Sequence, residues 1–193
     1  MSALEGALLG VVSFLEEREV PYMVVGGLAN AVWGEPRVTL DIDVTVWVED
    51  REIPGVVADL TSAFPALDAN PEAFVRRTRV LPLESGEGVR IDVIFGLLPF
   101  EREAIRRAVP IAIGGGSVRF CTAEDLVLMK IISNRDRDQS DARAIVLRRL
   151  ADLDLGYLEP RILELAGLLA RDDIKRRWEE WKAVAAAGGR TPR

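Results

Sequence analysis

Residues 24–46 read VVGGLANAVWGEPRVTLDIDVTV. From residue 39 to residue 48, apolar residues alternate with other residues, which is typical of a β-strand with one buried face. Asp41 and Asp43 fall on the same face of this predicted strand, with their Cα atoms roughly 7 Å apart. The opposite, apolar face is predicted to consist of Leu40, Ile42, Val44 and Val46.

Two carboxylates this close repel each other, so their face needs a cation, a basic partner or open water. A second alternating stretch, residues 89–95, predicts another strand, with Asp92 on the face opposite its apolar residues. If the two strands are neighbours, three acids converge and supply the hard oxygen ligands that Mg²⁺ prefers. A plain alternative stays open, in which Asp41 and Asp43 are the solvent side of an amphipathic strand.

A pair of glycines, Gly26 and Gly27, lies between a predicted buried strand at residues 22–25 and a predicted helix at residues 28–33. Backbone N–H groups at the start of a helix can hold phosphate in such a turn. The pair matches neither a P-loop nor the spaced glycines of a dinucleotide-binding fold. An ordinary tight turn is the alternative.

Composition limits the chemistry of the chain. With 193 residues, 49% of them hydrophobic, it can bury one core with a smaller helical appendage. A net charge of -6 and a pI near 4.9 argue against coating nucleic acid, although a local basic patch stays open. Because the chain has no histidine and only Cys121, it lacks a histidine-based zinc site, a Ser/His/Asp triad and an internal disulfide.

The apolar run at residues 7–15 is flanked by acids and is too short for a membrane span, so we expect a cytoplasmic protein without membrane contact. The other patterns predict a core at residues 1–120 and a helical region at residues 121–193 whose last few residues are flexible. The predicted core elements are helices at 3–18, 53–64 and 101–108, a strand within 74–83, a turn at 85–88 and a hairpin at 109–120. The predicted helices of the second region are 122–134, 138–151, 159–170 and 172–185.

The order of these motifs resembles the signature of the DNA polymerase beta-like nucleotidyltransferase superfamily: a Gly-Gly turn, a short helix, then Arg37, Thr39, Asp41 and Asp43. The resemblance implies an α/β fold in which a mixed β-sheet is flanked by helices and a C-terminal helical bundle closes one side of a cleft. It also implies that Gly26 and Gly27 cradle a triphosphate, with Arg37 and Thr39 as further nucleotide-binding residues. The acids Asp41, Asp43 and Asp92 would be both the catalytic and the metal-binding residues.

Further along, residues 124–130 followed by Arg135, Asp136, Arg137, Asp138 and Asp141 look like the branch that contains abortive-infection-type nucleotidyltransferase toxins. This likeness implies a phosphate contact for Lys130 and for Arg135. Three alternatives stay open. Lys130 could instead be a lysine at the edge of a core. Asp136, Asp138 and Asp141 could pair with Arg135, Arg137 and Arg143 and hold two helices in place. Arg37 could neutralise the Asp-x-Asp pair instead of touching phosphate.

The resemblance implies transfer of a nucleoside monophosphate from a nucleoside triphosphate to a hydroxyl acceptor, with release of pyrophosphate and two Mg²⁺ ions as cofactors. The acceptor is tRNA or protein if the chain is a toxin-like enzyme with an antitoxin partner. It is a small molecule if the chain is of the antibiotic-modifying kind. A non-catalytic nucleotide- or partner-binding module on the same fold is the third hypothesis.

Overall fold

The structure is a computed structural model and describes residues 2–188; the predicted flexible tail lies outside these residues apart from its start. The chain divides into two compact units. The first unit contains the chain up to Ala29 together with Val38–Cys121, and the second contains Asn30–Arg37 together with the chain from Thr122 onward. Residues 30–37, which the sequence placed within the core, therefore belong with the C-terminal helices.

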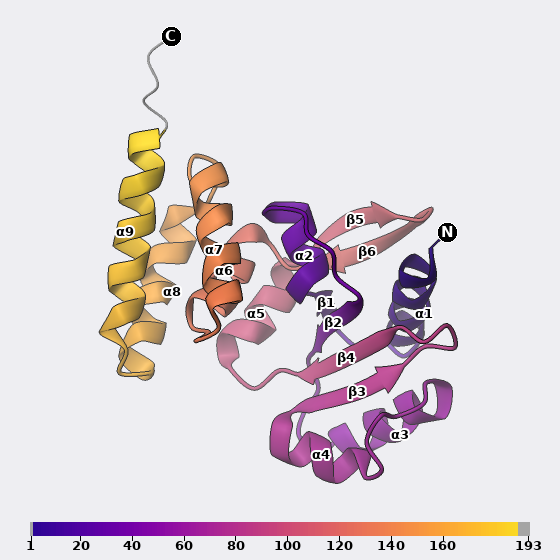
Figure 1. Cartoon of the computed structure of the whole chain (residues 1–193). Helices are drawn as coiled ribbons and strands as arrows, with labels where there is room; N and C mark the ends of the chain where they lie inside the picture. Colours follow the sequence, from indigo (N-terminus) through magenta and orange to yellow (C-terminus); the bar gives the residue numbers. More distant parts are fainter. Residues whose placement is uncertain (1, 189–193) are drawn as a thin grey trace. The chain divides into compact units, whose positions relative to one another are not determined.

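The first unit is built on one mixed, six-stranded sheet with the order β3-β4-β2-β1-β6-β5 (Figure 1). The pairs β2–β4 and β1–β6 are parallel, and the other neighbouring pairs are antiparallel. This sheet confirms the predicted α/β class. Its strands are β1 (Tyr22–Val24), β2 (Asp41–Val46), β3 (Val80–Glu84), β4 (Arg90–Phe95), β5 (Val109–Ile113) and β6 (Gly116–Phe120).

The alternation of β2 produces the buried face that the sequence predicted, with one correction. Ile42, Val44 and Val46 are fully buried, but Leu40 is 78% exposed. The ladder with β4 begins at the pair Asp41–Arg90, so Leu40 precedes the paired part of the strand and has no neighbouring strand to pack against.

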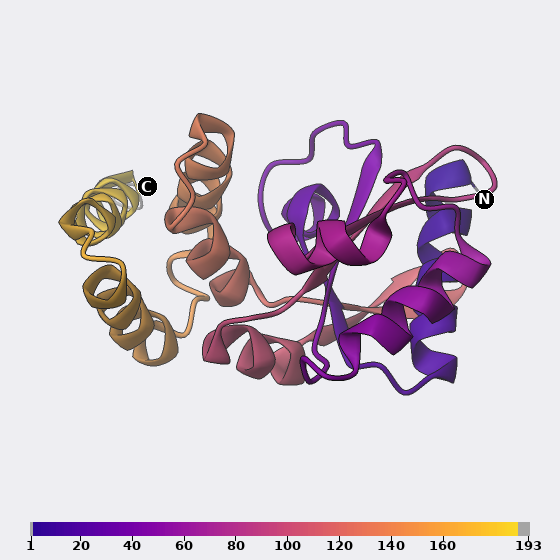
Figure 2. The same ribbon diagram turned by 90° about the horizontal axis from the view of Figure 1, so that it is seen from below.

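Four helices accompany the sheet in the first unit: α1 (Ala3–Glu17), α3 (Ile53–Ala63), α4 (Pro71–Thr78) and α5 (Pro99–Arg107). Helix α1 begins at a capping box in which Ser2 and Glu5 satisfy each other's backbone N–H groups. Helices α3 and α4 pack against each other, and α4 packs against β3. Figure 2, seen from below, shows both of them in front of the strands.

Helix α4 corrects the sequence analysis, which predicted only a strand within residues 74–83. Asn70 caps the helix, because its side chain accepts a hydrogen bond of 3.2 Å from the backbone N of Ala73, and Pro71 occupies the first turn. Arg79 ends the helix in the left-handed conformation, at φ 61°, and the chain then enters β3. The capping signal before residue 74 was the information that the strand prediction overlooked.

The second unit contains α6 (Ala123–Ile131), α7 (Asp136–Arg149), α8 (Leu155–Leu168) and α9 (Asp172–Gly188), and α2 (Gly26–Trp33) runs into it from the first unit. Helix α9 packs along α7 and α8 (Figure 1). Trp178 and Trp181 are 2% and 5% exposed, so they are packing residues of α9. Within residues 2–188, no helix is both long and apolar enough to cross a membrane.

Candidate active site

The glycine turn lies directly against the start of β2. Because β1 runs antiparallel to β2, the turn that follows β1 meets the end of β2 that carries Asp43, and the backbone N of Val25 donates to the carbonyl of Asp43 at 2.9 Å. A Cβ atom on Gly26 would lie 1.9 Å from Oδ2 of Asp43, and Gly26 has a φ of 63°. A Cβ atom on Gly27 would lie 2.4 Å from Oγ1 of Thr39. Both positions therefore require glycine, since Asp43 and Thr39 fill the space of a side chain.

The three predicted acids share one face of the sheet at this turn. In the parallel pair β2–β4, Asp43 is the partner of Asp92, and neighbouring strands lie about 4.8 Å apart. Asp41 lies two residues before Asp43 and is exposed, whereas Asp43 and Asp92 are half-buried. Oγ1 of Thr39 donates a hydrogen bond of 2.8 Å to Oδ1 of Asp41. We call Asp41, Asp43 and Asp92 the acidic edge.

Asp92, the third acid, is bound by Arg90, a basic residue that the sequence analysis overlooked. Nε of Arg90 lies 3.0 Å and 3.1 Å from the two carboxylate oxygens of Asp92. The register places Arg90 beside Asp41, on the same face as the acids. The pattern Arg-x-Asp in a strand contained this information, because residues two apart point to the same side.

The donor set of the acidic edge fits a divalent metal ion, because carboxylate oxygens are the ligands that Mg²⁺ takes from proteins. The arrangement of the third acid is less favourable, since Arg90 binds both oxygens of Asp92. In the part of the chain that the structure describes, no group of three or more His, Cys, Asp or Glu side chains is placed to hold a metal ion. Use of Asp92 as a ligand therefore requires Arg90 to move.

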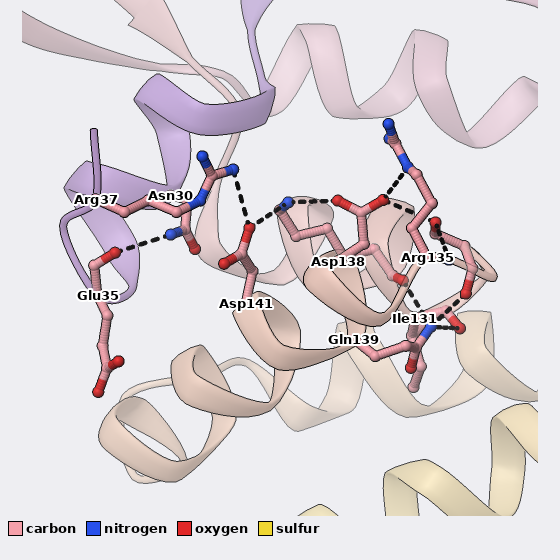
Figure 3. Close-up of polar contacts among 10 residues, drawn as sticks. Asn30, Glu35, Arg37, Ile131, Arg135, Asp138, Gln139 and Asp141 are labelled. Atoms are coloured by element: carbon pink, nitrogen blue, oxygen red, sulfur yellow. Dashed lines mark hydrogen bonds and ion pairs between the residues drawn. The ribbon is translucent and has the colours of Figure 1, made fainter. Parts of the chain in front are cut away.

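The other basic residues predicted to bind nucleotide lie in the second unit. Nζ of Lys130 is 2.9 Å from Oδ1 of Asp138 and 2.8 Å from Oδ2 of Asp141, and these three side chains are 6%, 12% and 10% exposed. Arg37 pairs with Asp141 at 3.3 Å, and Arg135 pairs with Asp138 at 2.7 Å. These contacts can be followed from Arg37 to Arg135 in Figure 3. We name the set the buried ion cluster, after its buried centre; its members are Lys130, Asp138, Asp141, Arg37 and Arg135.

The charges of the cluster decide the ionisation of Asp138. Burial raises the pKa of this carboxyl group, but hydrogen bonds from Lys130 and Ser133, with the charges of Lys130 and Arg135, outweigh burial. The pKa of Asp138 is therefore lowered below its ordinary value. Asp138 is therefore a carboxylate at neutral pH.

These contacts decide some of the alternatives and leave others open. Of the predicted pairs between acids and arginines, the structure contains Arg135 with Asp138, while the other cations of the cluster are Lys130 and Arg37. Lys130 as a whole residue is 5% exposed, so it lies deeper than the edge of a core. Its phosphate contact stays a prediction, as do those of Arg37 and Arg135.

Asn30 was also overlooked by the sequence analysis. It is fully buried, and its Nδ2 donates a hydrogen bond of 2.9 Å to the carbonyl of Glu35 (Figure 3). Two buried atoms in this region, Oδ1 of Asn30 and Nε of Arg37, have no hydrogen-bond partner in the structure. Asn30 therefore shapes the turn that carries Arg37 to Asp141, a role for which its isolated position in the sequence had no signal.

Comparison with known proteins agrees with this architecture. An antigenic nucleotidyltransferase-like protein from Paracoccidioides brasiliensis aligns over 91% of this chain and 92% of its own, with 16% identity and a TM-score of 0.54. The protein ANT(2'')-Ia in complex with adenylyl-2''-tobramycin aligns over 92% of this chain and 99% of its own, with 15% identity and a TM-score of 0.55. At these identities the likeness shows the fold alone.

A search of curated protein sequences found no match. The profile of one sequence family, described as a nucleotidyltransferase of unknown function (DUF6036), matches residues 7–186. This match includes the glycine turn, the acidic edge and the buried ion cluster. The chain therefore belongs to the nucleotidyltransferase family DUF6036.

Proposed function

We propose that the protein is a metal-dependent enzyme that transfers a nucleoside monophosphate from a nucleoside triphosphate to a hydroxyl group. The observation that carries this proposal is the contact between the glycine turn and the acidic edge, where Oδ2 of Asp43 lies 1.9 Å from the position of a Cβ atom on Gly26. Such a contact puts backbone N–H groups and carboxylates side by side. Backbone N–H groups can bind phosphate, and carboxylates can bind the cation that accompanies the phosphate.

In this proposal Gly26 and Gly27 hold the triphosphate through their backbone, and Thr39 keeps Asp41 oriented by its hydrogen bond. Asp41, Asp43 and Asp92 are the residues that would hold two Mg²⁺ ions. When bound, these ions neutralise charge on the triphosphate and lower the pKa of an attacking hydroxyl group. Positioning of the substrates and neutralisation of charge supply most of the rate acceleration.

The reaction forms one bond and breaks another at the α-phosphorus. The acceptor oxygen bonds to the α-phosphorus, the bond from that phosphorus to the bridging oxygen breaks, and pyrophosphate leaves with the bond electrons. The proton of the acceptor hydroxyl group passes to the carboxylate of Asp92. In the structure this carboxylate accepts hydrogen bonds of 3.0 Å and 3.1 Å from Nε of Arg90.

The direct test uses the purified protein with Mg²⁺ and each of the four nucleoside triphosphates, and measures pyrophosphate release and thermal stabilisation. We expect stabilisation by at least one triphosphate, because a ligand that binds only the folded state raises the melting temperature. The variant Asp41→Asn/Asp43→Asn should lose both signals. Unchanged stabilisation in this double variant would refute the metal site.

The acceptor is a separate part of the proposal, and we favour a small molecule. The solution structure of ANT(2'')-Ia, an antibiotic-resistance factor, has the same fold and aligns over 95% of this chain and 97% of its own. The chain also carries a net charge of -6, which disfavours a large footprint on RNA. A label transferred from a triphosphate to an aminoglycoside or a lincosamide would support this acceptor class.

One observation favours the toxin-like hypothesis: Arg135, the residue that precedes α7, is an exposed cation. The side chain of Arg135 is 83% exposed and suits a phosphate of tRNA. Expression that arrests growth, changed tRNA ends on sequencing, and relief by an antitoxin encoded beside the chain would support this hypothesis. Growth without arrest and with unmodified tRNA and protein would eliminate it.

The non-catalytic alternative is favoured by the contact between Arg90 and Asp92, which occupies one of the predicted ligands. A nucleotide- or partner-binding module needs no third carboxylate. Stabilisation by a triphosphate without any release of pyrophosphate, over all acceptors tried, would favour this module over the enzyme.

A further inference from the structure

We propose that Arg90 is a displaceable counter-cation of the acidic edge, which holds Asp92 until a metal ion arrives together with a triphosphate. This inference rests on the proposed function and adds the regulation of the same site. By this arrangement the protein binds divalent metal ions poorly without nucleotide. Arg90 is thus a positioning residue that controls when Asp92 becomes a ligand.

Arg90 and Asp92 form a close pair on one strand. Arg90 and Asp92 are two residues apart on β4, so both side chains lie on the face of the acidic edge. Nε of Arg90 contacts both carboxylate oxygens, at 3.0 Å and 3.1 Å. A metal ion that uses the same oxygens competes directly with this guanidinium group.

Arg90 also offsets negative charge at the acidic edge. The edge gathers three carboxylates, and the register places Arg90 next to Asp41 and two residue pairs away from Asp43. Repulsion among the three acids is reduced by one guanidinium charge at this place. A divalent cation at the same place has twice that charge, so its binding more than offsets the loss of the Arg90 charge.

Arg90 is much more exposed than its partner. The side chain of Arg90 is 56% exposed, whereas that of Asp92 is 17% exposed. A half-exposed ion pair in contact with water is weak, so Arg90 can leave at small cost. Asp92 is held by the strand and stays where it is.

Arg90 can bind another anion after it leaves Asp92. Its described contacts involve Nε alone, and a guanidinium group carries five N–H donors. The remaining donors suit an anion at the solvent side of the edge, and the triphosphate is the anion that the site receives. Binding of metal and nucleotide is therefore cooperative, because the nucleotide stabilises the displaced position of Arg90.

The experiment measures Mn²⁺ binding by electron paramagnetic resonance, without nucleotide and with the α,β-methylene analogue of each triphosphate. Without nucleotide, we expect Arg90→Gln to bind Mn²⁺ about fivefold more tightly than the wild type, the upper range for loss of an exposed pair. Arg90→Lys should behave as the wild type, because it keeps the cation. Arg106→Gln removes the same charge at a remote exposed pair with Glu103 and should leave binding unchanged.

A double-mutant comparison separates the effect of Arg90 on Mn²⁺ binding from an effect on folding. In the presence of Asp92→Asn, the change Arg90→Gln should no longer alter the Mn²⁺ dissociation constant, while circular dichroism confirms the same fold. Equal Mn²⁺ affinity of the wild type and Arg90→Gln without nucleotide would overturn the role of Arg90 alone. Failure of every variant to bind Mn²⁺ even with a triphosphate analogue would instead overturn the proposed function.

Discussion

The acidic edge and the buried ion cluster use the same residue types for opposite purposes. The edge has three carboxylates and one arginine, and Asp41 and Arg90 are exposed to water. The cluster has two carboxylates and three cations, and its centre, Lys130 with Asp138 and Asp141, is at most 12% exposed. The edge thus gathers acids at a place that is partly open to water, whereas the cluster pairs its two carboxylates with cations.

Under the proposed function, this difference separates a functional carboxylate from a structural one. Removal of one partner from a buried ion pair leaves an uncompensated charge and destabilises the fold. An exposed acid beside other acids adds repulsion to the folded state and is kept for a ligand. Substitutions at the edge should therefore affect activity, and substitutions in the cluster should affect stability.

The largest expected effect is on catalysis at the edge. The substitution Asp43→Asn should lower the rate of pyrophosphate release on the order of 1,000-fold, as loss of a group that stabilises transition-state charge does. The free energy of unfolding should stay within about 0.5 kcal/mol of the wild type, because the lost carboxylate repelled its neighbours. Asp59→Asn, at an exposed position on α3, is the matched control and should change neither quantity. A large loss of stability in Asp43→Asn would show that the edge is structural.

The next effect concerns the stability of the cluster. The substitution Lys130→Met should lower the free energy of unfolding by roughly 3 kcal/mol, because Asp138 and Asp141 lose the cation between them. Lys175→Met removes an exposed lysine that pairs with Asp172 at 3.4 Å, and it should change stability by less than about 0.5 kcal/mol. Urea unfolding followed by circular dichroism measures both values. Similar results for the two lysines would contradict the structural role of the cluster.

A smaller effect separates the glycine turn from ordinary glycine positions. Gly88→Ala should cost about 1 kcal/mol, because Gly88 has a φ of 75° with open space around its Cβ position. Gly26→Ala should cost more than Gly88→Ala, because Gly26 combines a φ of 63° with the close approach of Asp43. It should also abolish stabilisation by triphosphates, which thermal unfolding with and without nucleotide measures. Retention of nucleotide binding in Gly26→Ala would contradict the proposed phosphate turn.

The smallest effect is the pH dependence that Asp138 contributes. Its pKa is lower in the folded protein than in the unfolded chain, so its stabilisation is complete above the ordinary aspartate pKa of about 3.9. This stabilisation is lost as the pH falls below that value and through the lower pKa of the folded state. Asp138→Asn should therefore show a flatter decline of unfolding free energy in acid, and Asp136→Asn, an exposed neighbour on α7, should keep the wild-type slope. Equal slopes in all three proteins would exclude Asp138 as the source.

Local patterns in the sequence predicted most of the fold but not every element. The alternation in β2 and β4 and the helical spacing after residue 120 correspond to elements of the structure, since these periods come from the geometry of the chain itself. Helix α4 was overlooked because its cap at Asn70 lies outside the apolar pattern. Arg90 was overlooked although it lies two residues from Asp92 on the same strand face.

The sequence by itself determined that Asp41 and Asp43 share a strand face, that a glycine turn precedes them, and that no histidine takes part in the chemistry. These properties depend on residues close together in the chain or on composition. Only the tertiary structure decided that β4 pairs with β2 so that Asp92 lies beside Asp43. It also decided that Lys130 binds Asp138 and Asp141. Strand order and the partner of a charge depend on how distant segments pack, and no local period of the sequence encodes that packing.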